Sequence, residues 1–178
     1  MREQYSTLDI CKALGITRER LRDWMNRGFI KPSIQEAKGQ GTKALFSRND
    51  VYLIMLFLTL IWNGINRKES SGIIQDLGED RKSKDFKTFM ESDFLLFRSS
   101  YFKEKRSRAM VTIDMYKGNL LDVETAMPHI FYKHKALKEM EKIFDQKGET
   151  ESGWIVSFIV NFNTIKKDTD EALSTIEE

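Results

Sequence analysis

Four arginines share one short segment with an apolar stripe, and no other residues of this chain are better suited to chemistry. The segment "ITRERLRDWMNRGFIKPS" runs from Ile16 to Ser33, and its arginines are Arg18, Arg20, Arg22 and Arg27. Leu21, Trp24 and Met25 follow the i, i+3, i+4 spacing of a buried helix face. Guanidinium groups on the other face would bind phosphates and the acceptor edge of guanine. The pattern therefore favours a helix that docks on a core and presents cations to DNA.

Residue types for catalysis or metal binding are sparse. The chain has one cysteine, Cys11, and two histidines, His129 and His134, whose spacing is not the i, i+4 spacing of a helical metal site. We expect Cys11 to be a small buried packing residue. The stretch "GQGTK" lacks the preceding strand and the spacing of a phosphate-binding loop. We therefore expect no enzyme activity, no metal site and no cofactor.

Charge is distributed unevenly along the chain, although the net charge is only +2. Residues 1–48 carry ten Lys or Arg against five Asp or Glu, whereas residues 109–178 carry eight against thirteen. The basic segment is suited to binding a polyanion, whereas the acidic segment at the end of the chain is not. The start of the chain is charged, unlike a signal peptide, and the apolar run from Val51 to Trp62 is shorter than the roughly 20 residues that span a bilayer. We expect a cytoplasmic protein with no membrane partner.

The arginine segment is preceded by a short helix and a tight turn. Ser6 or Thr7 can cap the first helix, and Gly15 can adopt the left-handed conformation that the turn needs. Thr17 caps the second helix, which ends at Gly28. Two helices and a turn in this space have the spacing of a helix-turn-helix.

The following segment predicts a wing and then a buried helix. Gly39 and Gly41 make a flexible tip, and "KALF", residues 43–46, predicts a short strand. Ser47 and Asp50 have the spacing of a capping box at the start of the next helix. That helix is apolar nearly all round, so it must bury two faces.

The rear of the chain predicts strands over 93–102, 108–117 and 153–162, with the basic stretch 103–108 as a hairpin loop. An amphipathic helix is expected over 127–148 and a closing helix over 162–176. Phe162, Ile165 and Ile176 lie at heptad-like spacing, so the closing helix is one candidate dimer interface, and the second face of the Val51 to Trp62 helix is the other.

The predicted fold class is α+β. A winged helix-turn-helix, mostly α with a small β-wing, occupies residues 1–78. A charged connector follows over 79–92, and a small C-terminal α+β domain for dimerisation or sensing occupies 93–178.

Six sequence features occur in order along the front half of the chain. They are "YS", a small residue at Cys11, "LGIT" at the turn, "LR-x-W" in the second helix, "RGFIKPS" after it and "FS-x-x-DV" after the wing. This ordered set resembles the DNA-binding domain of the MerR family of transcription regulators. It covers roughly residues 5–76, under half of the chain. The resemblance implies a winged helix-turn-helix, a homodimer, and a palindromic DNA site that is bent or untwisted on binding.

The resemblance also assigns roles to residues. Thr17, Arg18 and Arg20 would face the major groove, and Arg22 would hold a phosphate. Trp24 stands where the family usually has Tyr, so it would contact the DNA backbone, pack in the core, or do both. Ala44 stands where the wing usually has Arg, so that contact is absent or taken over by Lys43. The full expected DNA-binding set is Thr17, Arg18, Arg20, Arg22, Trp24, Lys38, Lys43 and Arg48.

We therefore predict a transcription regulator that binds double-stranded DNA as a homodimer, through the recognition helix 17–27 and the wing 36–46. RNA polymerase is a further candidate partner. Two alternatives stay open: an excisionase-like architectural protein that bends DNA, and a protein-interaction module that retains the fold. The size of the rear half argues against the first, and the arginine density of residues 17–27 argues against the second. The long dimerising helix of the family is absent, so its effector classes do not transfer.

Overall fold

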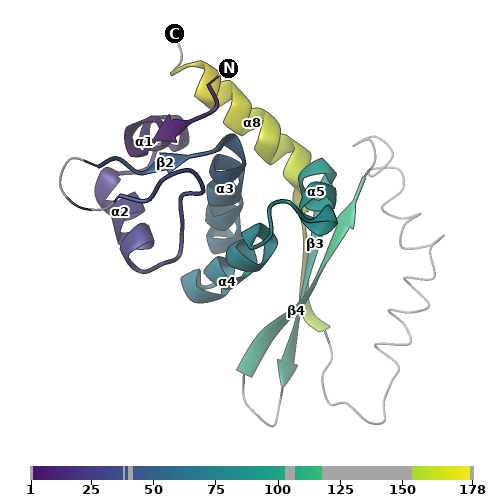
Figure 1. Cartoon of the computed structure of the whole chain (residues 1–178). Helices are drawn as coiled ribbons and strands as arrows, with labels where there is room; N and C mark the ends of the chain where they lie inside the picture. Colours follow the sequence, from purple (N-terminus) through teal and green to yellow (C-terminus); the bar gives the residue numbers. More distant parts are fainter. Residues whose placement is uncertain (1, 38, 40–41, 103–106, 118–153, 177–178) are drawn as a thin grey trace, which may run out of the picture. The chain divides into compact units, whose positions relative to one another are not determined.

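A computed structural model describes residues 2–37, 39, 42–102, 107–117 and 154–176 of the chain (Figure 1). The chain forms two compact units, of which the first comprises Met1–Met90 with Phe162–Glu178 and the second Glu91–Asn161. Helices make up most of the first unit, and the described strands of the second form an antiparallel sheet, which confirms the α+β class. The amphipathic helix predicted over 127–148 lies outside the described residues.

The helix-turn-helix forms where the sequence predicts it. Helix α1 spans Thr7–Leu14 and helix α2 spans Arg18–Asn26. Their N-caps are Ser6 and Thr17, both in extended conformation. Gly15 ends α1 with a φ of 62°, a left-handed conformation that glycine adopts without steric cost. The turn between the helices is therefore set by local residues.

The wing is built on a very short ladder. Strand β1, Tyr5–Ser6, pairs antiparallel with strand β2, Leu45–Phe46. Gln35 forms an isolated bridge to Leu45 on the other side. The strand predicted over 43–46 is thus confirmed in its last two residues, and the chain between Gln35 and Leu45 forms the wing.

Helix α3, Arg48–Trp62, is the centre of the first unit, and most of its apolar side chains are buried. Helix α4, Arg67–Gly78, and helix α8, Phe162–Ser174, both pack against it (Figure 1). Two neighbouring helices explain why α3 is apolar nearly all round. The exception is Trp62, at the end of the helix, which is 63% exposed.

The first unit extends further along the chain than the sequence predicts. Helix α5, Lys84–Glu91, forms within the expected connector, and it buries Phe86 and Phe89. Phe89 stacks on Phe162 of α8 with ring centroids 4.7 Å apart, and Lys166 Nζ donates to the Met90 carbonyl at 2.9 Å. The closing helix, expected in the rear domain, therefore lies in the first unit, because its apolar face packs on helices of that unit.

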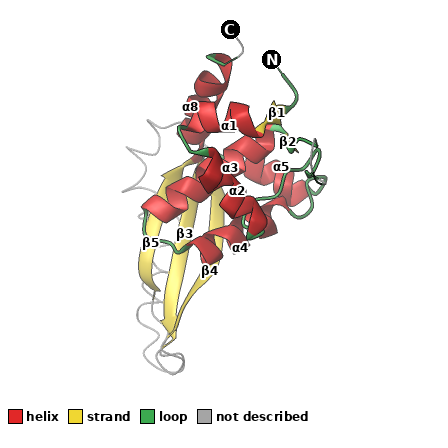
Figure 2. Ribbon diagram, turned by 90° about the vertical axis from the view of Figure 1, so that its left-hand side faces the viewer, coloured by secondary structure: helices red, strands yellow, loops and turns green. Residues whose placement is uncertain are grey.

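The second unit contains a three-stranded antiparallel sheet with the order β4-β3-β5 (Figure 2). Its strands are β3, Phe94–Phe102, β4, Ser107–Tyr116, and β5, Trp154–Asn161. Each strand begins and ends within one residue of the positions predicted from the sequence. Phe94 of β3 pairs with Tyr116 of β4 and with Asn161 of β5. Along the chain, β3 follows α5, and β5 leads directly into α8.

Candidate nucleic-acid interface

Helix α2 is held rigidly at both ends. The Thr17 hydroxyl accepts a hydrogen bond from the Arg20 backbone N–H at 3.2 Å, which satisfies one of the free donors of the first turn. At the other end Gly28 has a φ of 70° and donates to the Met25 carbonyl at 2.9 Å. Phe29 N–H then donates to the Trp24 carbonyl at 2.8 Å. The helix therefore begins and ends at fixed positions.

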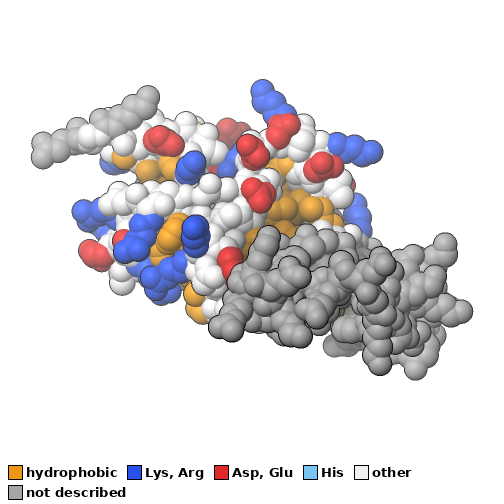
Figure 3. Space-filling model, turned by 90° about the horizontal axis from the view of Figure 1, so that it is seen from below, with side chains coloured by type: hydrophobic (Ala, Val, Ile, Leu, Met, Phe, Trp, Pro, Cys, Tyr) orange, Lys and Arg blue, Asp and Glu red, His pale blue; other side chains and the backbone are white. Residues whose placement is uncertain are grey.

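Helix α2 buries its apolar side chains and exposes its arginines. Leu21 and Trp24 are buried, and the Trp24 ring meets Phe57 of α3 edge-on at 5.1 Å between centroids. Arg18, Arg20 and Arg22 are exposed. Figure 3, which views the molecule from below, shows Lys and Arg side chains gathered on the side of the first unit where α2 lies. All three arginines are accessible: Arg18 and Arg22 lie four residues apart on one side of α2, whereas Arg20 lies on the side of Trp24.

Trp24 needs a correction. Its side chain is only 1% exposed, because Phe57 and the body of the first unit surround it. Of the two roles left open for this ring, core packing is the one that the structure supports. A contact between Trp24 and the DNA backbone is not available to a buried ring.

The wing provides one described cation. Lys43 is exposed, and its carbonyl accepts a hydrogen bond from the Gln35 side-chain amide at 3.1 Å. Ala44 beside it is buried at 4% exposure, so this position would not present a side chain to DNA. Lys38, the other wing residue of the predicted set, lies outside the described residues.

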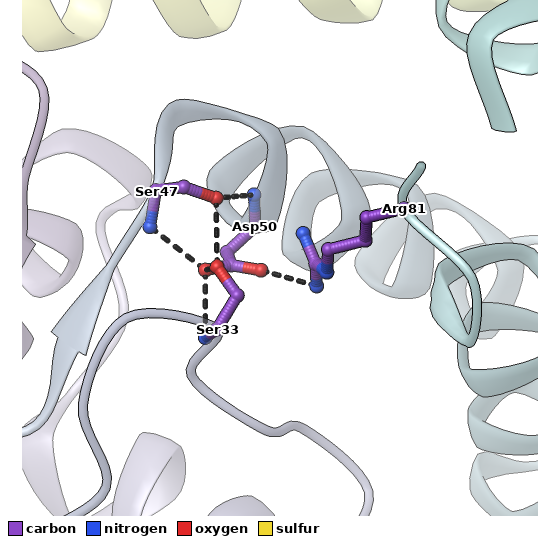
Figure 4. Close-up of polar contacts among 4 residues, drawn as sticks. All are labelled: Ser33, Ser47, Asp50 and Arg81. Carbon is purple, nitrogen blue, oxygen red and sulfur yellow. Dashed lines mark hydrogen bonds and ion pairs between the residues drawn. The ribbon is translucent and has the colours of Figure 1, made fainter. Parts of the chain in front are cut away.

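A buried carboxylate joins the segments before and after the wing to Arg81 (Figure 4). Asp50 is 2% exposed, and its Oδ2 accepts hydrogen bonds from the backbone N–H of Ser47 at 2.7 Å and of Ser33 at 3.0 Å. The Ser33 hydroxyl donates to the same oxygen at 2.5 Å, and Arg81 pairs with Oδ1 at 2.5 Å. A buried charge needs such partners. The sequence identified Asp50 only as a capping residue, because Ser47 lies three residues before it. Ser33 and Arg81 lie farther away along the chain, and no sequence pattern marks them as partners of Asp50.

Arg48 has a partner within the first unit. Its guanidinium pairs with Asp170 of α8 at 2.6 Å, and the Tyr52 hydroxyl donates to the same carboxylate oxygen at 2.6 Å. Burial and the neighbouring carboxylate raise the pKa of Tyr52, so its hydroxyl stays protonated and able to donate. Arg48 thus helps to pack α8 on α3, while 32% of its side chain stays exposed, and its contact with DNA stays a prediction.

The side chains expected at the dimer interface have other neighbours. Phe162 and Ile165 are buried within a single chain, at 0% and 6% exposure, and Ile176 is half-buried. A side chain that is already buried gains little from a second chain. The other expected surface, the second face of α3, is covered by α8.

Three further observations concern the cysteine, metal ions and membranes. Burial raises the pKa of the Cys11 thiol, which suits the packing role expected for this residue. Among the residues that the structure describes, no three His, Cys, Asp or Glu side chains lie together as a metal site would require. None of the described helices is long and apolar enough to cross a bilayer.

An exposed basic helix that follows a tight turn, together with a short wing, defines a winged helix-turn-helix DNA-binding domain. Residues 5–77 match the family described as MerR HTH family regulatory protein. This segment, from β1 to the end of α4, is therefore a MerR-type helix-turn-helix domain, and the resemblance seen in the sequence is confirmed. The match covers less than half of the chain, and the matched family is one of DNA-binding transcription regulators. No curated protein matched the chain.

Proposed function

We propose that this protein regulates transcription by binding a palindromic operator as a homodimer, through the recognition helix 17–27 and the wing 36–46. The observation that carries the proposal is that α2 buries Leu21 and Trp24 while its three arginines stay exposed. The second helix of a helix-turn-helix enters the major groove with its N-terminal residues at the base edges. Thr17, Arg18 and Arg20 occupy that part of α2.

Different arginines would contribute differently. Arg18 and Arg20, in the first turn, would donate paired hydrogen bonds to guanine, and such a contact is worth about 1–3 kcal/mol of discrimination. Arg22 would neutralise a phosphate, as would Lys43 of the wing, and phosphate contacts position the protein without reading sequence. RNA polymerase is the further partner that a regulator bound at an operator implies, and such a protein would act in the cytoplasm.

The need to select one DNA site in a genome argues for a dimer. One recognition helix reads only a few base pairs, which is too little to select a site in a genome. A two-fold dimer doubles the contacts and places the half-sites about 34–36 Å apart, or at a multiple of that distance. We place the joint in the second unit, Glu91–Asn161, since the apolar faces of α3 and α8 are already buried in the first.

Titration of fluorescently labelled duplex DNA against salt tests the proposal. Affinity should fall steeply with salt, and Arg22→Ala should reduce the log–log slope by about 0.9 while weakening all sequences alike. Arg18→Ala should instead cost about 1–3 kcal/mol on the preferred site and relax base preference there. Lys167→Ala removes the same charge from an exposed position on α8 and serves as the control, with no expected change.

Selection of bound fragments from random duplex DNA completes the test. Enriched palindromes, together with a dimeric mass by light scattering, would support the proposal. A wild-type protein that enriches no sequence and shows no salt-dependent binding would contradict it.

A further inference from the structure

One arginine of the recognition helix is held by an aromatic ring. The guanidinium carbon of Arg20 lies 4.9 Å from the centroid of the Trp24 ring. The two residues are four apart on α2, so their side chains lie on neighbouring positions of one helix face. Within the part of the chain that the structure describes, this is the recognition helix's one cation–π contact.

The ring is itself fixed. Trp24 is buried, and Phe57 of α3 meets it edge-on with an interplanar angle of 76°. Phe57 also contacts Phe29, at 6.3 Å between centroids, just beyond the end of α2. The Trp24 ring is therefore less mobile than the ring of an exposed side chain. It provides Arg20 with a rigid support inside the first unit.

The chemistry of the contact leaves Arg20 able to bind. A guanidinium stacks through its flat face, and tryptophan is the best of the aromatic partners. The N–H groups lie in the plane of the guanidinium, so stacking does not consume them. The Arg20 backbone is fixed as well, through its N–H bond to the Thr17 hydroxyl. A long side chain that is ordered before binding loses less entropy when it meets its target.

We propose that Trp24 is a positioning residue for Arg20, which it holds so that the guanidinium presents its paired N–H donors to a guanine in the major groove. This inference rests on the proposed function and adds a specificity determinant to it. The base preference contributed by Arg20 should then depend on Trp24, although Trp24 touches no DNA. Arg22, which has no such support, should contribute affinity without this dependence.

The first test measures base preference. Trp24→Phe keeps an aromatic ring against Phe57 but weakens the attraction for a cation. It should reduce discrimination about two- to fivefold at the operator position where Arg20→Ala acts, and leave non-specific affinity unchanged. In the Arg20→Ala background, Trp24→Phe should have no further effect. Arg22→Ala is the matched control, because it should weaken all sequences equally.

The second test needs no DNA. The chain has three tryptophans, so Trp62→Phe with Trp154→Phe leaves Trp24 as the single emitter. In that background Arg20→Ala should increase quenching by acrylamide, since it uncovers the ring, whereas Arg22→Ala should not. Trp24→Tyr replaces Trp24→Phe in the binding test if the phenylalanine variant fails to fold.

The outcomes separate the inference from the proposed function. A wild-type protein that binds no DNA overturns the proposed function, and unchanged quenching in Arg20→Ala overturns the stacking. Intact binding with unaltered base preference in the folded Trp24 variant overturns the positioning role. A loss of preference confined to the Arg20-dependent position, with increased quenching in Arg20→Ala, supports it.

Discussion

Removing residues 162–178 should unfold the DNA-binding unit, although the deleted helix lies far along the chain from the helix-turn-helix. Helix α8 packs on α1 and α3, and Asp170 on α8 receives the hydrogen bonds of Arg48 and Tyr52. Without α8, one face of the most apolar helix of the chain would meet water. A cooperative fold should not survive that exposure.

The magnitude follows from the side chains that α8 buries. Phe162, Ile165 and Leu173 are 0%, 6% and 2% exposed. Burial of one such side chain contributes about 1.5–3 kcal/mol, so the three together contribute about 5–9 kcal/mol. The free energy of unfolding of a whole domain is about 5–15 kcal/mol. The loss is therefore comparable with the whole stability of the unit, before the uncovered side chains of α3 are considered.

The matched control removes the second unit and keeps α8. A short Gly-Ser linker would join Glu91 to Phe162, in place of residues 92–161. The two points lie close together, because Phe89 stacks on Phe162 and Lys166 bonds the Met90 carbonyl. This internal deletion should melt cooperatively, bind DNA and remain monomeric if the dimer joint lies in the second unit.

Thermal melting by circular dichroism, with a hydrophobic dye as a second probe, distinguishes the two deletions. The protein without residues 162–178 should show no cooperative transition and should bind the dye. The internal deletion should show a transition and little dye binding. The reverse result, a stable protein without α8 and an unfolded internal deletion, would refute the assignment of α8 to the DNA-binding unit.

Three further predictions concern single residues. Gly28→Ala should cost about 1–2 kcal/mol in a urea melt, because its φ of 70° is left-handed, and an unchanged midpoint would contradict this. Arg81→Met should cost roughly 1.5–3 kcal/mol, because it leaves the buried Asp50 without its cation; a neutral result would mean that the serine donors suffice. Burial raises the pKa of Asp9, but hydrogen bonds from Ser6 and the charge of Arg2 outweigh it, so the pKa lies below the ordinary value of an aspartate. That contribution to stability is present above the unfolded pKa and lost as the pH falls below about 4. Ser6→Ala should thus cost about 1 kcal/mol at pH 7 and less at pH 3, as two urea titrations would show.

The sequence alone was enough for several features that depend on near neighbours. The capping residues Ser6, Thr17 and Ser47, the turn at Gly15 and the exposed arginines of α2 follow from contacts within about four residues. The residue types of the rear segments likewise placed the three strands within one residue of their ends. These features are local, so the pattern of residue types determines them before the chain is packed.

Only the tertiary structure decided which side chains each surface uses. Arg48 has the residue type of a DNA contact, yet its partner Asp170 lies 122 residues further along the chain. Trp24 has the position of a backbone contact, yet Phe57 holds it in the core. Helix α8 has the spacing of a dimer helix, yet α1 and α3 take its apolar face. An apolar or charged face requires a partner, and the choice among possible partners depends on the path of the whole chain.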